Sequence, residues 1–219
     1  MPNTSAQEDY LKAIFRLGKG TERVSTAALA SALGVRKPSV TAMMKRLSAE
    51  GLVEYSSGRG VTLSERGRLA TMRVVRRHRL LELFLVEGLG LDWSEVHAEA
   101  EVLEHHLSER LVTAIDRWLG HPSEDPHGHP IPDAEGNLRE HDVVPLRALA
   151  SGEHARVREL RARDGDRLQR WKELGLVPGA ACRMGGKQEM EDVMHIDVGG
   201  RRIVTGSEGI EGVFVEPVA

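Results

Sequence analysis

Apolar residues recur at helical spacing through the start of the chain and predict three short helices. The first covers residues 5–17 and begins with a capping box, in which Ser5 and Glu8 satisfy free backbone N–H groups. The second covers residues 25–33 and the third covers residues 37–50, and a glycine follows each of them.

Two short β-prone runs come next, at residues 52–55 and 61–63, around a glycine-rich turn. The order helix, helix, turn, helix, hairpin is that of a winged helix-turn-helix. Residues 1–63 are therefore expected to form a domain of the kind that reads DNA.

The helical period returns over residues 64–120 and predicts three longer helices. They are expected to start at Ser64, Asp92 and Ser108, and the second of them is expected to continue to about residue 107. This region is interpreted as an all-helical domain.

Residues 121–153 are rich in Pro, His, Gly and Asp and predict a linker or an ordered loop. Beyond them the pattern is that of short strands, with Gly199 and Gly200 in a tight hairpin turn and one helix near residues 167–174. Residues 154–219 therefore predict a small β-barrel. The expected fold class is α+β, with a winged helix-turn-helix, an all-helical domain and a small barrel.

The 219 residues carry a net charge of −3, but residues 1–80 carry +9 and residues 81–219 carry −12. A basic first part indicates a polyanionic partner. No apolar run is long enough to span a bilayer, and the N-terminus lacks the apolar core of a signal peptide. We therefore expect a cytoplasmic protein with no membrane partner. The single cysteine, Cys182, excludes an internal disulfide and a cysteine-based zinc finger.

On the third helix, polar and small side chains lie off the apolar stripe and are free to face a major groove. Lysine and arginine suit phosphates, whereas serine, threonine and alanine suit base edges and thymine methyl groups. The candidate DNA contacts, including one arginine at the hairpin tip, are Arg36, Lys37, Pro38, Ser39, Thr41, Ala42, Lys45, Arg46 and Arg59. The same scaffold could instead bind a protein, an alternative that the charge asymmetry disfavours.

A second set of residues has the spacing of metal ligands. At about 100° per residue, four side chains share one stripe of the second longer helix. They are His97, Glu101, Glu104 and His105. On the preceding helix, His78 and Glu82 are about one turn apart and lie on one face. Two such helices packed antiparallel would direct carboxylates and imidazoles into one cleft, a ligand set that suits Mn²⁺ or Fe²⁺. The alternative is that these are ordinary surface side chains.

Three segments resemble the diphtheria-toxin-repressor family of metal-activated bacterial repressors. They are Glu-Asp-Tyr-Leu from Glu8, Arg-His-Arg-Leu-Leu-Glu from Arg77, and Val-His-Ala-Glu-Ala-Glu from Val96. The loop at residues 126–132 and the barrel are similar to those of the longer members. Residues 174–179 resemble the FeoA-like barrel domains of bacterial iron transport, which implies an SH3-like fold.

The resemblance implies that the helical domain of residues 64–120 serves dimerisation and metal binding. It implies a primary metal site at Asp9, Glu101, Glu104 and His105, and a second site at His78, Glu82 and His97. In long members the barrel adds a ligand, for which Asp164 is the candidate. The iron-responsive branch has sulfur-bearing side chains where this chain has Asp9 and Glu101, so the chain is similar to the manganese branch. Short manganese regulators have a carboxylate at the position of Lys12.

The resulting hypothesis is a manganese-activated homodimeric repressor that binds palindromic double-stranded operator DNA, controls metal-uptake genes and is not an enzyme. Fe²⁺ and other divalent metals are alternative cofactors, and an iron-responsive repressor of the same family is the alternative function. A dinuclear metal hydrolase is an alternative from another class. A third is a winged-helix regulator whose His and Glu residues are structural. The residues expected at the dimer contact, or alternatively in the core, are Leu83, Leu85, Val102, Leu111 and Ile115.

Overall fold

The computed structural model describes residues 3–18, 22–162, 164–188 and 192–218. Two compact units make up the chain. The N-terminal unit comprises Met1–His78, Leu103–Leu107 and Pro132–Leu138, and the C-terminal unit comprises Arg79–Val102, Ser108–Ile131 and Arg139–Ala219.

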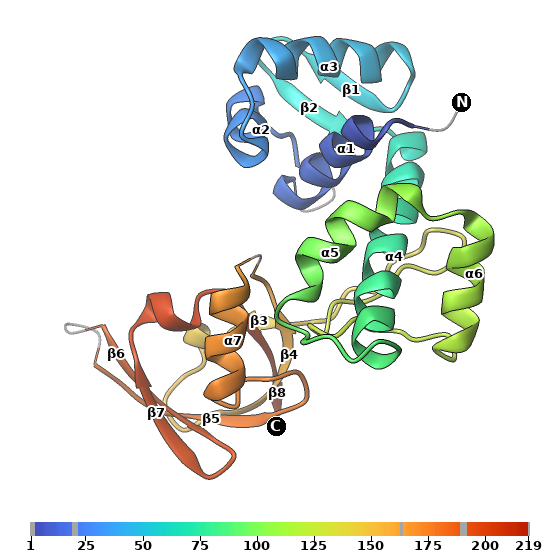
Figure 1. Cartoon of the computed structure of the whole chain (residues 1–219). Helices are drawn as coiled ribbons and strands as arrows, with labels where there is room; N and C mark the ends of the chain where they lie inside the picture. Colours follow the sequence, from blue (N-terminus) through green and yellow to red (C-terminus); the bar gives the residue numbers. More distant parts are fainter. Residues whose placement is uncertain (1–2, 19–21, 163, 189–191, 219) are drawn as a thin grey trace. The chain divides into compact units, whose positions relative to one another are not determined.

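The N-terminal unit contains the winged helix-turn-helix that the sequence predicted (Figure 1). Its elements are α1 (Ser5–Leu17), α2 (Thr26–Leu33), α3 (Lys37–Ala49), β1 (Val53–Ser56), β2 (Gly60–Leu63) and the first part of α4 (Glu65–Glu87). β1 and β2 pair antiparallel, with Val53 opposite Leu63. Leu11, Leu29 and Met44 are fully buried where the three helices meet. This apolar centre holds α3 in place and leaves its other side to solvent.

Local capping explains where α1 begins and where α2 ends. Thr4 caps α1, because its side chain accepts the N–H of Gln7 while the Gln7 side chain accepts the N–H of Thr4. The predicted box of Ser5 and Glu8 is therefore wrong by one residue, and Glu8 makes tertiary contacts instead. Gly34 closes α2 with a φ of 64°, a conformation that favours glycine.

In the C-terminal unit, α5 (Val96–Leu103) and α6 (Glu109–Trp118) follow the second part of α4. The helix expected to reach residue 107 ends at Leu103, and a 3₁₀ turn, η1 (Glu104–His106), comes after it. Ser108 caps α6 through the N–H of Leu111, as expected for a helix starting there. The rings of Phe84 and Trp118 pack edge to face at 5.5 Å and tie α4 to α6.

The rest of the C-terminal unit is a six-stranded antiparallel sheet with the order β3-β8-β4-β5-β6-β7 (Figure 1). Its elements are β3 (Val144–Pro145), η2 (Leu146–Ala148), β4 (His154–Leu160), α7 (Gly165–Glu173), β5 (Ala181–Gln188), β6 (Val193–Val198), β7 (Arg201–Thr205), η4 (Ser207–Ile210) and β8 (Val213–Val218). Trp171 of α7 is fully buried, and its indole N–H donates to the Gly209 carbonyl at 2.8 Å. Val144 pairs with Val215, so part of the expected linker belongs to the sheet.

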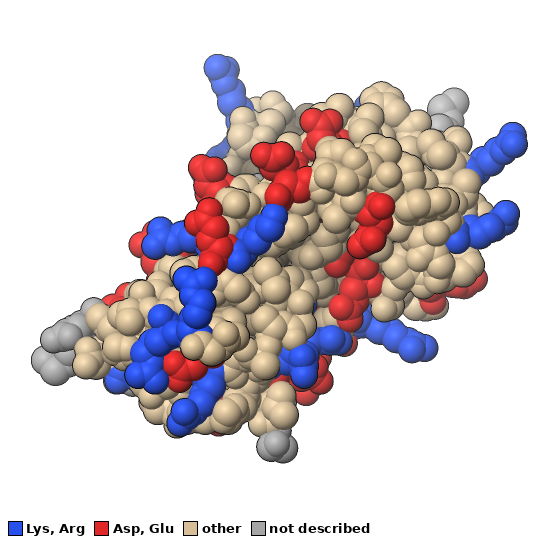
Figure 2. All heavy atoms as spheres, turned by 60° about the horizontal axis from the view of Figure 1, so that its bottom comes forward, with Lys and Arg blue, Asp and Glu red and all other residues tan. Residues whose placement is uncertain are grey.

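Among the residues that the structure describes, no helix has both the length and the apolar character needed to cross a bilayer. The face drawn in Figure 2 carries acidic and basic side chains next to one another. Charges of both signs therefore share this part of the surface.

Candidate metal-binding and DNA-binding sites

Two elements of the N-terminal unit bring two carboxylates and an imidazole together. Asp9 comes from α1, and Glu104 and His105 come from η1, and one ligand atom of each lies within 4.8 Å of the others. His105 Nε2 lies 3.0 Å from Asp9 Oδ1 and 3.5 Å from Glu104 Oε1. Carboxylate oxygens and imidazole nitrogens suit hard to borderline divalent ions. These three residues are called the primary cluster.

Glu104 is the most deeply buried member of the primary cluster, with no exposed side-chain surface. Lys12 Nζ donates to Glu104 Oε1 at 2.8 Å, and His78 Nδ1 lies 2.6 Å from Glu104 Oε2. A buried carboxylate costs several kcal/mol unless charges and hydrogen bonds compensate it. The side chains of α1 and α4 therefore hold this carboxylate in place.

The 3₁₀ turn changes the predicted arrangement of the ligands. The prediction placed His97, Glu101, Glu104 and His105 on one stripe of a continuous α-helix. The continuous helix is wrong, because α5 ends at Leu103 and the following 3₁₀ turn has about three residues per turn rather than 3.6. Glu104 and His105 belong to the N-terminal unit, while Glu101 lies on α5 in the C-terminal unit, with Oε1 3.7 Å from His97 Nε2.

A second cluster lies in the C-terminal unit around the buried Glu82. Glu82 Oε1 lies 2.9 Å from His97 Nδ1, and Glu82 Oε2 lies 3.7 Å from His127 Nδ1. Ligand atoms of Asp125, His127 and His129 lie within 4.8 Å of one another, and the first two residues are buried. Glu82, Asp125, His127 and His129 are called the secondary cluster. The predicted association of Glu82 with His97 appears here as a direct contact.

Burial disfavours charge in the secondary cluster, but neighbouring groups outweigh it. Desolvation alone would raise the pKa of Asp125, yet the charge and hydrogen bond of His129 lower it. Desolvation alone would lower the pKa of His127, yet the hydrogen bond and charge of Glu82 raise it. These shifts favour the ionised carboxylate of Asp125 and the protonated ring of His127.

The sequence interpretation missed Asp125, His127 and His129 as candidate ligands. The Asp125 carboxylate accepts the N–H groups of His127 at 2.8 Å and of His129 at 2.9 Å, which fixes the turn. Gly128 lies at its centre with a φ of 83°, and a Cβ there would lie 1.8 Å from the Arg158 carbonyl oxygen. The available signal was the Asp-x-His-x-His spacing inside the expected linker.

Two predicted ligands have other immediate partners. Asp164 is exposed and caps α7, where its side chain accepts the N–H of Asp166 at 3.1 Å. It belongs to neither cluster. His78 belongs to the N-terminal unit and contacts Glu104.

The predicted DNA contacts lie on the open side of α3 and at the tip of the β1–β2 hairpin. Val40, Met44 and Leu47 are buried and form the inner side of α3. The predicted contacts on this helix and its N-cap are all exposed or half-buried, namely Arg36, Lys37, Pro38, Ser39, Thr41, Ala42, Lys45 and Arg46. Arg59 is exposed in the hairpin turn. This is the side-chain placement that a recognition helix and a wing require.

Helix α1 is connected to both the primary cluster and α3. The side-chain amide of Gln7 donates to Glu50 Oε2 at 2.7 Å, and Glu50 Oε1 accepts from Arg46 Nε at 3.1 Å. Asp9 lies two residues after Gln7 on the same helix. One helix thus carries a candidate metal ligand and a contact to the end of the recognition helix.

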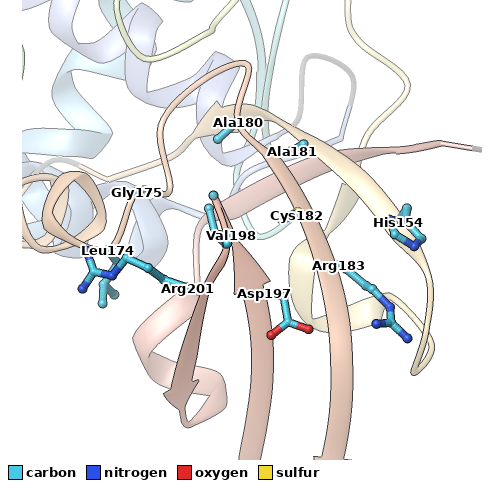
Figure 3. A pocket seen from close by; sticks show the side chains of 12 residues that line it. His154, Leu174, Gly175, Ala180, Ala181, Cys182, Arg183, Asp197, Val198 and Arg201 are labelled. Carbon is cyan, nitrogen blue, oxygen red and sulfur yellow. The ribbon is translucent and has the colours of Figure 1, made fainter.

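The C-terminal sheet has an open pocket of about 620 Å³ next to the β6–β7 turn (Figure 3). Its polar lining includes His154, Arg183 and Arg201. Its carboxylate, Asp197, accepts from Arg202 Nε at 2.8 Å. This lining differs from the carboxylate–imidazole pairs of the two clusters, so we place the candidate metal chemistry outside the pocket.

Three family models match the chain in the expected order. The N-terminal DNA-binding domain of the iron-dependent repressors matches residues 3–61, and their metal-binding and dimerisation domain matches residues 64–133. The FeoA domain matches residues 144–217. The matches thus extend over most of the chain.

Similar proteins include two kinds of regulator. The iron-dependent repressor IdeR of Mycobacterium tuberculosis (strain ATCC 25618 / H37Rv) is 34% identical over 185 residues, which cover 79% of this chain and 80% of that protein. The HTH-type transcriptional regulator MntR of Lysinibacillus sphaericus (strain C3-41) is 39% identical over 114 residues, which cover 51% of this chain and 80% of that protein.

Solved structures agree with these matches. A manganese-dependent transcriptional repressor in complex with manganese superposes with a TM-score of 0.91 at 36% identity, covering 97% of this chain and 100% of that one. ScaR with bound Zn²⁺ superposes with a TM-score of 0.82 at 32% identity, covering 97% and 99%. These proteins are regulators, a different class from the dinuclear hydrolases that were the alternative. The chain belongs to the diphtheria-toxin-repressor family of metal-dependent transcriptional repressors.

Proposed function

We propose that this repressor is activated by Mn²⁺ at the primary cluster and acts in the cytoplasm as a homodimer on palindromic operator DNA that controls metal-uptake genes. The observation that carries the proposal is the contact of Asp9 with His105, next to Glu104. It joins α1, which packs against the DNA-reading helices, to η1.

The donor set supports manganese. The primary cluster offers oxygen and imidazole ligands, and the only sulfur nucleophile of the chain, Cys182, is buried in the C-terminal sheet. Without a thiolate, the preference for softer metals is removed. The iron-dependent IdeR relatives make Fe²⁺ the competing activator.

The residues of the primary cluster have different proposed roles. When bound, the divalent ion supplies the positive charge that lets the Asp9 and Glu104 carboxylates share one site. Asp9 holds α1 to η1, and Glu104 anchors the site through His78 and Lys12. We retain Glu101 as a further ligand on the family resemblance alone.

We propose the secondary cluster as a second metal site, built on Glu82, Asp125 and His127. Its support is the proximity and burial of these groups in the C-terminal unit. His97 contacts Glu82 and is an additional candidate ligand. Asp164 and His78 stay predictions for this site.

For DNA binding, the exposed residues of α3 and Arg59 are proposed to contact the operator, with Lys45 and Arg46 on phosphates. For dimerisation, the exposed apolar side chains of Val102, Leu111 and Trp118 are proposed to meet a second copy. Two residues expected at that contact, Leu85 and Ile115, are buried in the chain's own core.

The test is anaerobic DNA binding titrated with Mn²⁺, Fe²⁺, Co²⁺ and Zn²⁺, on duplexes selected from a random pool by the manganese-loaded protein. Asp9→Asn removes the charge at constant size and should abolish the response to Mn²⁺, while the control Glu99→Gln, on an exposed part of α5, should keep it. DNA affinity that is unchanged by Mn²⁺ and by chelation would contradict the proposal. If Fe²⁺ activates DNA binding at a lower free concentration than Mn²⁺ does, the protein is an iron-responsive repressor.

A further inference from the structure

We propose that Glu8 is a positioning residue for the primary cluster: it sets the orientation and the proton of the His105 ring, and Arg77 holds Glu8 in place. This inference rests on the proposed metal site. Two consecutive residues of α1 contact the two nitrogens of the same imidazole. Glu8 Oε2 lies 2.7 Å from His105 Nδ1, and Asp9 Oδ1 lies 3.0 Å from His105 Nε2.

In the neutral imidazole, which is the form that can bind a metal, the two carboxylates compete for one proton. A neutral imidazole carries a single N–H, a carboxylate can only accept it, and a metal can bind only the nitrogen that lacks it. The Glu8 contact is shorter, and the Glu8 side chain is 12% exposed whereas that of Asp9 is 42% exposed. A charged acceptor binds a donor more strongly where water is excluded. The proton therefore belongs on Nδ1, which leaves the Nε2 lone pair facing Asp9 and Glu104.

Arg77 completes the arrangement from α4. Its Nη2 donates to Glu8 Oε1 at 2.7 Å, and its side chain is 13% exposed. Glu8 thus uses one oxygen for Arg77 and the other for His105, so its carboxylate cannot rotate without losing a contact. Carboxylates that orient a ligating histidine typically affect metal affinity by ten- to a hundredfold.

The competing explanation is that the Glu8–Arg77 pair only packs α1 against α4. The variant Glu8→Gln distinguishes the packing role from the positioning role. Glutamine has the size of glutamate and can still accept a hydrogen bond from Arg77, but it lacks the negative charge that favours a proton on His105 Nδ1. The charged Asp9 then attracts the proton to Nε2. The matched control is Glu65→Gln, an exposed glutamate in the first turn of α4.

Two measurements on the full chain test the proposal. Long-range ¹H–¹⁵N NMR of histidine-labelled, metal-free protein, recorded at a pH where the His105 ring is neutral, should show the His105 proton on Nδ1 in the wild type and on Nε2 in Glu8→Gln, with His105→Gln used to assign the signal. Mn²⁺ titration followed by electron paramagnetic resonance should show binding weakened about tenfold to a hundredfold in Glu8→Gln and unchanged in Glu65→Gln.

A wild-type His105 proton on Nε2, or wild-type Mn²⁺ affinity in Glu8→Gln, overturns the inference. A lower melting temperature with unchanged Mn²⁺ affinity would likewise assign Glu8 to packing and overturn it. Failure of the proposed function looks different, because the wild type itself would then take up no Mn²⁺ at this cluster. The NMR measurement needs no metal and stands in either case.

Discussion

Replacing Lys12 with methionine is expected to loosen α1 in the metal-free protein and to have little effect in the presence of Mn²⁺. Lys12 Nζ donates to the fully buried Glu104, and the Lys12 side chain is 15% exposed. Glu104 contacts Lys12, His78 and His105. Methionine keeps the apolar stem of Lys12 but removes its ammonium group, so that of these three contacts only those with the two imidazoles remain. Removing one partner of a buried ion pair costs about 3–5 kcal/mol. Because two imidazoles still contact Glu104, we expect the lower end, about 3 kcal/mol.

Hydrogen-exchange mass spectrometry of the α1 segment measures this loss, because the free energy of local opening sets the exchange rate. At about 1.4 kcal/mol per factor of ten, a loss of about 3 kcal/mol makes exchange roughly a hundredfold faster. Saturating Mn²⁺ should restore slow exchange, since its charge replaces the ammonium group next to Glu104. Lys45→Met, on the exposed side of α3, is the matched control and should leave α1 unchanged.

Two results would refute this reasoning. If Lys12→Met exchanges at the wild-type rate under chelation, solvent already screens the ion pair and Glu104 does not depend on it. If exchange is equally fast with and without Mn²⁺, Lys12 holds α1 by packing, and the metal does not replace its charge.

Three further predictions concern other parts of the chain. Lys45→Ala or Arg46→Ala should weaken binding to all duplexes alike. Each variant should also reduce the slope of log Kd against the logarithm of the salt concentration by about one, as measured by fluorescence anisotropy. The hydrogen bond of Lys172 lowers the pKa of Asp92 to about 2 from 3.8, so the stability that Asp92 adds is present above its unfolded pKa and lost as pH falls toward 2. Acid unfolding followed by tryptophan fluorescence should show this loss of stability in the wild type. In Asp92→Asn, stability should depend less on pH over the same range. Burial raises the pKa of Cys182 to about 11, so iodoacetamide should alkylate it near neutral pH only after denaturation, as read by mass spectrometry.

The fold was largely predictable because its signals are local. Apolar periodicity and helix caps marked every helix of the winged domain, and Gly199 with Gly200 marked the turn between two strands correctly. The end of α5 was predicted wrongly, because it lies next to tertiary contacts. Glu104 and His105 in the 3₁₀ turn contact His78 of α4 and Glu8 of α1, and the spacing of residues 97–105 cannot reveal contacts with other helices.

The candidate sites were less predictable because they depend on contacts between distant segments. Asp9, Glu104 and His105 came together as the family resemblance implied. The role of Glu8 and the participation of His127 could not be read from periodicity, since each depends on a residue far along the chain. Sequence spacing finds ligands on one element, whereas the residues that orient them need tertiary structure.

The close approach of Gly128 to Arg158 limits how this protein can be recombined with its relatives. A side chain at position 128 would collide with the β4 backbone, so the turn that carries Asp125 and His127 is fitted to that strand. A chimaera in which the sheet comes from another parent should therefore take the turn from the same parent. A junction placed between the turn and β4 would separate two segments that fit only as a pair, however well each half folds alone.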